Sequence, residues 1–201
     1  MSDETPSPGR IAPAVAAEFP ELALWRLDVD ALSGRSPDEV HERLRHLANR
    51  FRGAEAVLMR TRPIPHAYRV FFRHIGLDPD AQRTPVEQRA LERLMHGGFR
   101  SAGIVEDALT IAIVETGVPV WALDARHLAG DLEVREDAGG RLVVADDGGP
   151  VALLFGEPQP QHAVTKDTRR VALFSIQVAG VPSIHVGEAL WTAAEILEDV
   201  R

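Results

Sequence analysis

The side chain in this sequence best placed to do chemistry is Asp107. It lies in the apolar run 104–116, three residues before Thr110, so the two share one face of a helix. A carboxylate in such a setting is costly unless it is paired or hydrogen-bonded. Two interpretations follow. Asp107 and Thr110 line a pocket as catalytic candidates, or Asp107 is a structural acid that holds loop amides or an arginine.

Tyr68 and Arg69 form a second pair with chemical potential. A tyrosine ring can stack on a nucleotide base while a neighbouring guanidinium pairs with phosphate. The alternative is a tyrosine buried in the core beside an exposed arginine, and the sequence favours neither interpretation.

Arginine is concentrated in one part of the chain. Residues 43–100 hold twelve arginines against five acidic residues, a surplus of +7 in a protein of net charge −8. The remainder of the chain therefore carries −15. This asymmetry is compatible with a local surface that faces an anion such as RNA. It is equally compatible with solvated, arginine-rich helix faces.

Several kinds of chemistry are excluded. The chain has no cysteine, which removes disulfides, thiolate zinc sites and cysteine nucleophiles. Its eight histidines are scattered, and no phosphate-binding glycine loop, Gly-x-Ser-x-Gly elbow or His-Glu-x-x-His motif occurs. We therefore predict no metal and no cofactor.

The elements that must position these side chains predict an α+β fold. Helical spacing dominates residues 36–116, and Ser36-Pro37 and Thr84-Pro85 are typical helix starts with a hydroxyl cap. Short strands and glycine-containing hairpin turns follow in the second half, before a closing helix. Helices therefore pack on a mostly antiparallel layer with short hairpins. The predicted segments are a strand at 20–29, helices at 36–53, 65–75, 84–97, 104–116 and 188–197, and strands at 120–123, 132–135, 142–145, 151–155 and 171–178.

The domain organisation follows from composition. Residues 1–10 are polar and contain proline, which predicts a disordered lead, and residues 11–201 are expected to form a single domain. No secretory signal is recognisable, and no apolar window is long enough for a membrane span. We expect a cytoplasmic protein with no membrane partner.

An ordered set of motifs resembles a known family. Residues 65–98 contain the runs AYR, FFR and GLDP and the helix start TPVE. Residues 104–124 read IVEDALTIAIVETGVPVWALD, and Leu154-Phe155-Gly156 and Thr168 come later. The order and spacing of these motifs, over roughly residues 15–200, resemble those of free-standing B3/B4-domain proteins. The B3/B4 domain is the tRNA-binding and editing region of the phenylalanyl-tRNA synthetase β subunit.

The resemblance implies a B3/B4-like fold and a set of site residues. In that family the domain binds tRNA, and in the synthetase it hydrolyses tyrosine wrongly esterified to phenylalanine tRNA. Carried over, the catalytic candidates are Asp107, Thr110 and Gln177. The substrate pocket is expected at Trp121, Asp124, Gly156 and Thr168. The RNA-binding residues are expected to be His66, Tyr68, Arg69 and Arg73.

The departures from the family pattern limit this transfer. The editing histidine of the synthetase corresponds to Trp121, which does no acid–base chemistry, and no acidic residue stands near residues 174–177. The aminoacylation site is absent, so the chain is not expected to charge tRNA by itself.

Two functions stay open. The first is a tRNA-binding domain, with hydrolysis of mischarged aminoacyl-tRNA in trans if it is an enzyme. The second is a module that binds a free amino-acid-like small molecule in the same pocket. DNA is not an expected partner.

Overall fold

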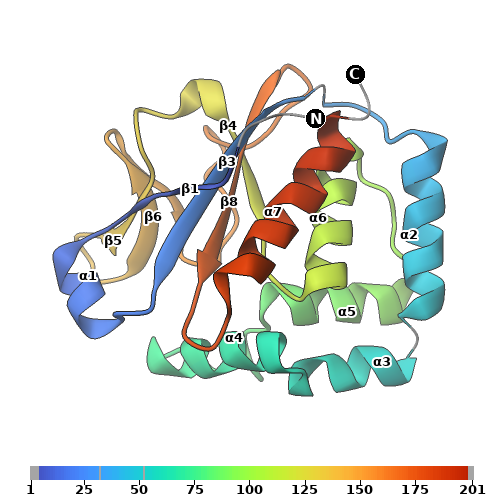
Figure 1. The fold of residues 1–201 in the computed structure, drawn as a ribbon, viewed down its shortest axis with the longest axis horizontal. Helices are drawn as coiled ribbons and strands as arrows, with labels where there is room; N and C mark the ends of the chain where they lie inside the picture. Colours follow the sequence, from blue (N-terminus) through green and yellow to red (C-terminus); the bar gives the residue numbers. More distant parts are fainter. Residues whose placement is uncertain (1–4, 32, 52, 199–201) are drawn as a thin grey trace.

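Two four-stranded sheets organise the protein, seen here in a computed structural model that describes residues 5–31, 33–51 and 53–198. The first sheet is antiparallel throughout and has the order β1-β3-β8-β4 (Figure 1). Its strands are β1 (Ser7–Pro8), β3 (Ala23–Asp30), β8 (Arg170–Gln177) and β4 (Trp121–Asp124). The long central pair β3–β8 therefore brings the beginning and the end of the chain together.

The second sheet has the order β2-β5-β6-β7. Strand β2 runs parallel to β5, and the other pairs are antiparallel. The strands are β2 (Arg10–Ile11), β5 (Glu133–Glu136), β6 (Leu142–Asp146) and β7 (Gly149–Leu153). The predicted hairpins of the second half are thus the core of this sheet.

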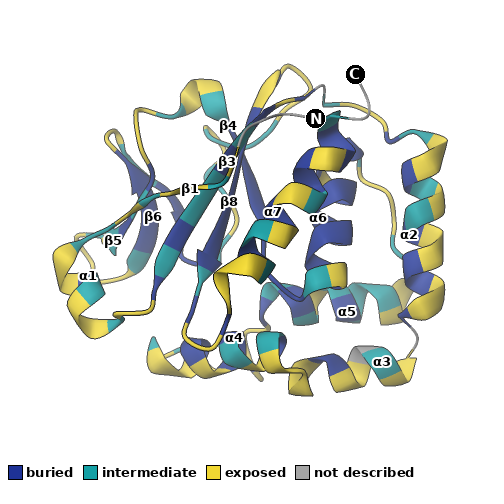
Figure 2. Cartoon of the chain, in the orientation of Figure 1, coloured by how far each residue is buried: buried dark blue, intermediate teal, exposed yellow. Residues whose placement is uncertain are grey.

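Helices α6 (Ile104–Thr116) and α7 (Ser183–Glu198) supply the central helical layer. Helix α7 packs on β3 and β8 and against α6, which is apolar on nearly all sides and buried as that composition predicts. Figure 2 shows α6 largely in dark blue, whereas α7 and the peripheral helices have exposed outer faces in yellow.

Helices α2, α3, α4 and α5 lie around this layer, whereas α1 lies beside β5 of the second sheet (Figure 1). Helix α5 starts with the predicted capping box, in which Thr84 accepts from the Glu87 N–H, and it ends at the left-handed Gly97. These outer elements are α1 (Pro13–Glu18), α2 (Asp38–Arg50), α3 (Gly53–Leu58), α4 (Pro63–His74), α5 (Pro85–His96) and the short 3₁₀ turns η1 (Met59–Thr61) and η2 (Ala125–His127).

The predicted α+β fold class is confirmed, and four local predictions need correction. Residues 7–8 and 10–11 form strands rather than a disordered lead, because their backbone pairs with β3 and β5; residues 1–4 lie outside the described residues. The Ser36 hydroxyl does not cap α2, since it donates to Asp107 instead. Helix α1 was not predicted, and α7 begins five residues before the expected start.

Within the described ranges, no helix is long and apolar enough to cross a membrane.

Candidate functional site

A cavity of about 450 Å³ lies between α5 and α6 on one side and β4 and the 154–156 turn on the other. Its walls combine apolar and polar groups, and the apolar part includes Leu109 and Ile113 of α6 with Trp121 and Phe155 opposite. The volume lies within the range of small-molecule sites in proteins. The site therefore suits a compact ligand with an apolar or aromatic part.

The aromatic wall of the cavity is held rigidly. The Trp121 ring stacks on Phe174 of the paired strand β8, with ring centroids 5.4 Å apart and planes 17° apart. The Phe155 ring packs within 5.1–5.9 Å of Trp121 and of three aromatic side chains of α4, which are Tyr68, Phe71 and Phe72. Such a cluster keeps the wall in one position.

The turn that carries Phe155 is strained. Phe155 has a φ of 61°, in the left-handed region that non-glycine residues seldom occupy. At Gly156, which lines the cavity, an added Cβ would lie 2.9 Å from the Leu153 Cβ. Strain of this kind persists where surrounding contacts hold the backbone, and it is frequent at ligand sites.

The mouth of the cavity carries charges of both signs. Arg89 pairs with Glu92 at 3.3 Å and with Glu106 at 3.1 Å. Arg83 and Glu157 also line the mouth, and neither has an ion-pair partner within the described residues. These two exposed side chains are the charged groups left available to a ligand, and neither was predicted. Their signal in the sequence is weak, because they are ordinary surface residues next to a turn or a helix start.

Asp107 is buried, 1% exposed, but it does not line the cavity. Its carboxylate accepts from the Ser36 and Ser101 hydroxyls, each at 2.5 Å, and from the Ala102 N–H at 3.0 Å. Helix α6 faces the cavity with Val105, Glu106, Leu109 and Ile113, so this acid points elsewhere. These contacts match the interpretation of Asp107 as a structural acid that holds the loop before α6.

We expect Asp107→Asn to lower the free energy of unfolding by about 1–2 kcal/mol, because a charged acceptor of three hydrogen bonds becomes a neutral amide. Ligand binding in the cavity should be unchanged. Urea unfolding measures the first effect, and Glu106→Gln on the next residue is the matched control, with a change below about 0.5 kcal/mol. A large loss of binding in Asp107→Asn would contradict the structural assignment.

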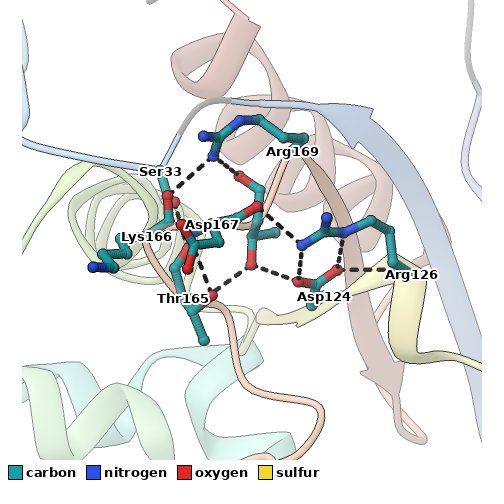
Figure 3. A network of polar contacts seen from close by, with 8 residues as sticks. Ser33, Asp124, Arg126, Thr165, Lys166, Asp167 and Arg169 are labelled. Carbon is teal, nitrogen blue, oxygen red and sulfur yellow. Dashed lines mark hydrogen bonds and ion pairs between the residues drawn. The ribbon is translucent and has the colours of Figure 1, made fainter.

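Asp124 and Thr168 lie together, but in a different place from the cavity. Both are fully buried, and the Thr168 hydroxyl donates to the Asp124 carboxylate at 2.7 Å. Arg126 donates to the same carboxylate from its backbone at 3.0 Å and from its guanidinium at 3.2 Å (Figure 3). Burial raises the pKa of Asp124, but the hydrogen bonds from Arg126 and Thr168 outweigh burial and lower the pKa to about 2.

The surrounding loop completes this network. Thr168 accepts from the Thr165 N–H at 2.9 Å, and Arg126 also donates to the Asp167 carbonyl. Figure 3 shows these side chains converging on the 165–169 loop from the end of β4. The predicted substrate contacts at Asp124 and Thr168 are therefore occupied by bonds within the protein.

The other catalytic candidates also lie away from the cavity. Gln177 accepts from the Trp25 indole N–H and donates to the Val181 carbonyl, both at 2.9 Å. Thr110 is buried in α6 and is not part of the cavity lining. Of the residues predicted for catalysis or for the substrate pocket, Trp121 and Gly156 are the pair that the structure brings together at the cavity.

The residues expected to bind RNA are divided between core and surface. Tyr68 is fully buried, and its hydroxyl donates to the Ile176 carbonyl at 2.9 Å, so no base can stack on it. Burial raises the pKa of Tyr68. Arg69 is buried as well and pairs with Glu87 and with Asp80. His66 and Arg73 are exposed on α4.

Most arginines of residues 43–100 are held by acidic groups of the protein itself. Arg43 and Arg50 both pair with Glu115, and Arg62 pairs with Glu55. Arg52 lies outside the described residues. Arg83 and Arg89 are the members of this set that line the cavity. These ion pairs are what the alternative of solvated, arginine-rich helix faces describes. No cluster of three or more histidine or acidic side chains within the described ranges could hold a metal ion.

The structure is thus an α+β fold with a cavity that has one aromatic wall. Part of the sequence is similar to the phenylalanine–tRNA ligase beta subunit of three bacteria. The identity is 36% over 78 residues in Methylococcus capsulatus, 33% over 116 residues in Xanthomonas oryzae and 31% over 85 residues in Shewanella oneidensis. These matches cover 39%, 50% and 42% of this chain.

The matched regions are a small part of those relatives. They amount to 10%, 14% and 10% of the respective beta subunits. No family model matches the chain. Up to half of this chain therefore resembles a segment of the phenylalanine–tRNA ligase beta subunit, and the similarity supports a relationship at that level.

Proposed function

We propose that this protein is a B3/B4-type domain that binds the aminoacyl end of tRNA, with the amino-acid side chain held in the cavity beside Trp121 and Phe155. The observation that carries the proposal is the cavity itself. Its apolar and aromatic walls suit an amino-acid side chain, and its mouth offers Arg83 and Glu157 to the polar end of the ligand. The partial similarity to phenylalanine–tRNA ligase beta subunits supports the choice of tRNA.

Hydrolysis of the ester would need a group that activates water at the mouth. No histidine lines the cavity among the described residues, and Glu92 and Glu106 are paired with Arg89. Glu157 follows Gly156 directly and is the carboxylate without such a partner in the described ranges. We assign water activation to Glu157, a role that a carboxylate can fill when it lies within reach of the reacting carbonyl.

The direct test measures binding and deacylation of a panel of mischarged tRNAs. We expect Trp121→Ala to weaken binding of aminoacyl-tRNA by about tenfold or more, because a large aromatic wall of the pocket is lost. Trp191→Ala, which removes a tryptophan that is 44% exposed on α7, is the matched control and should change neither activity. Absence of both salt-dependent tRNA binding and turnover above a heat-killed sample would rule the proposal out.

Two charge variants separate the roles at the mouth. Glu157→Gln should abolish turnover while leaving the affinity for aminoacyl-tRNA within about twofold. Arg83→Glu should weaken RNA binding. It should also reduce the slope of the logarithm of the affinity against the logarithm of the salt concentration by about 1, the value for one phosphate contact. Arg45→Glu, an exposed charge reversal on α2, is the control for the second variant.

A second candidate function is the binding of a free amino-acid-like small molecule in the same cavity. It is favoured by the internal pairing of Arg43, Arg50, Arg62 and Arg69, which leaves little cationic surface for a long RNA contact. Under this alternative, Trp121→Ala still weakens ligand binding, but Arg83→Glu has no effect that depends on RNA or salt.

A further inference from the structure

Helix α7 presents an apolar and acidic face to solvent, away from the cavity described above. Ile184 is 63% exposed and Trp191 is 44% exposed, and they lie two turns apart on the same side of the helix. Glu188 and Glu195 are exposed on this side as well, and the helix contains no lysine or arginine. Figure 2 shows this outer surface in yellow. We call these four side chains the α7 face.

The tryptophan of the α7 face is held in place. A Cβ added at Gly187 would lie 3.3 Å from the Trp191 ring, so the ring lies over the glycine. A side chain that is already ordered loses less entropy when a partner binds, and tryptophan is enriched among the residues that dominate binding energy. Trp191 therefore has the properties of an interface anchor.

A second exposed apolar surface lies on α3 and α5, which pack against each other. Its members are large apolar side chains that are between 43% and 68% exposed, namely Val57 and Leu58 of α3 with Leu94 and Met95 of α5. Soluble proteins expose single apolar side chains routinely, but such a group on adjacent helices is typical of a binding surface. We call these four side chains the α3–α5 face.

Cations flank the α3–α5 face. The Arg93 guanidinium donates to the Ala48 carbonyl at 2.9 Å, and this neutral acceptor leaves its positive charge uncompensated. Arg60 and Arg100 are exposed on the segments next to α3 and α5. The α3–α5 face is therefore apolar and basic, whereas the α7 face is apolar and acidic.

The signs of these charges decide how two copies of the chain can meet. Contact between two α7 faces would bring glutamates together, and contact between two α3–α5 faces would bring arginines together. Like charges facing each other disfavour both arrangements. Contact between unlike faces instead covers two apolar surfaces and surrounds them with opposite charges. Because one chain carries both faces, a second copy of the chain is the partner that fits.

We propose that the α7 face of one copy binds the α3–α5 face of a second copy. Trp191 and Met95 are the central apolar anchors, since aromatic residues and methionine are enriched in protein interfaces. The glutamates of α7 and the arginines beside α5 orient the two copies. Neither face lines the cavity beside Trp121, so this association is independent of the function proposed above.

Sedimentation velocity of the full chain, from about 1 to about 200 µM, tests the proposal. We expect association to increase with concentration and to weaken in about 1 M NaCl, where ions screen the charges across the contact. Trp191→Lys and Met95→Asp should each weaken association by about tenfold or more. Leu153→Asp, at an exposed apolar residue of β7 outside both faces, is the control and should associate like the parent protein. Circular dichroism verifies that each variant is folded.

A mixture of the two defective variants tests the pairing of unlike faces. Trp191→Lys keeps an intact α3–α5 face, and Met95→Asp keeps an intact α7 face. An equimolar mixture should therefore form a 1:1 complex at concentrations where neither variant associates alone.

A parent protein that stays monomeric at every concentration would overturn the proposal. Association of Trp191→Lys or Met95→Asp as strong as that of the parent protein would also overturn it. A parent protein that associates, combined with a mixture of variants that stays monomeric, would exclude contact between unlike faces.

Discussion

Replacement of Arg69 by alanine is expected to lower the free energy of unfolding by about 3–5 kcal/mol, the cost of breaking a buried ion pair from one side. The Arg69 guanidinium donates to the Glu87 carboxylate, to Asp80 at 2.6 Å and to the Pro79 carbonyl at 3.4 Å. Removing it leaves Glu87, itself largely buried, without its cation. Urea unfolding followed by circular dichroism measures the loss.

The same contacts explain why the effect should extend to the cavity. Glu87 also forms the capping box with Thr84 at the start of α5, and this helix supplies one wall of the site. Arg69 therefore links α4 to the helix that bears Arg89. Ligand binding should weaken in parallel with stability.

Two further variants make this prediction decisive. Arg73→Ala removes an arginine one turn further along α4 that is 52% exposed and lies 4.0 Å from Asp80, so it should cost less than about 1 kcal/mol. Arg69→Lys keeps the positive charge but loses the planar guanidinium that donates to two carboxylates. Its loss of unfolding free energy should lie between those of Arg69→Ala and Arg73→Ala. A loss in Arg69→Ala no larger than in Arg73→Ala would show that the buried pair contributes little.

The second large effect is expected at Asp124. Its folded-state pKa of about 2 lies below the ordinary value of 3.8 because hydrogen bonds from Arg126 and Thr168 favour the carboxylate. By linkage, the ionised form stabilises the fold by about 2 kcal/mol above pH 4. This contribution decreases as the pH falls from 4 towards 2, where the folded state also takes up the proton.

Asp124→Asn should therefore lower the free energy of unfolding by about 2 kcal/mol at pH 7, and the difference from the parent protein should shrink below pH 4. Chemical unfolding at a series of pH values from 7 to 2.5 measures both the difference at pH 7 and its decrease below pH 4. Glu21→Gln, the same carboxyl-to-amide change at an exposed position, provides the control and should show no such trend. A difference that stays constant down to pH 2.5 would exclude the ionic origin of the effect.

Local sequence signals determined much of the secondary structure. The Thr84-Pro85 start and Gly97 end of α5 follow directly from capping chemistry, and the apolar run 104–116 predicts a buried helix. The strands with glycine turns formed the second sheet as expected. These features depend on neighbouring residues, so the sequence alone was enough to predict them.

The assignment of site residues depended on contacts between distant segments. Nothing near Asp107 in the chain indicates that Ser36, 71 positions earlier, satisfies it, or that Asp124 is satisfied by Thr168. Trp121 and Gly156, which the family resemblance assigns to one substrate pocket, both line the cavity. The sequence contains no sign of Arg83 or Glu157 at the cavity mouth.

The tertiary structure thus decided which polar residues remain available for function. Asp107, Asp124 and Arg69 are buried, and each needs internal partners to offset the loss of hydration. Folding supplies those partners from other elements, which removes these side chains from the site. The sequence determined the fold class, whereas three-dimensional packing decided which charged side chains face the cavity.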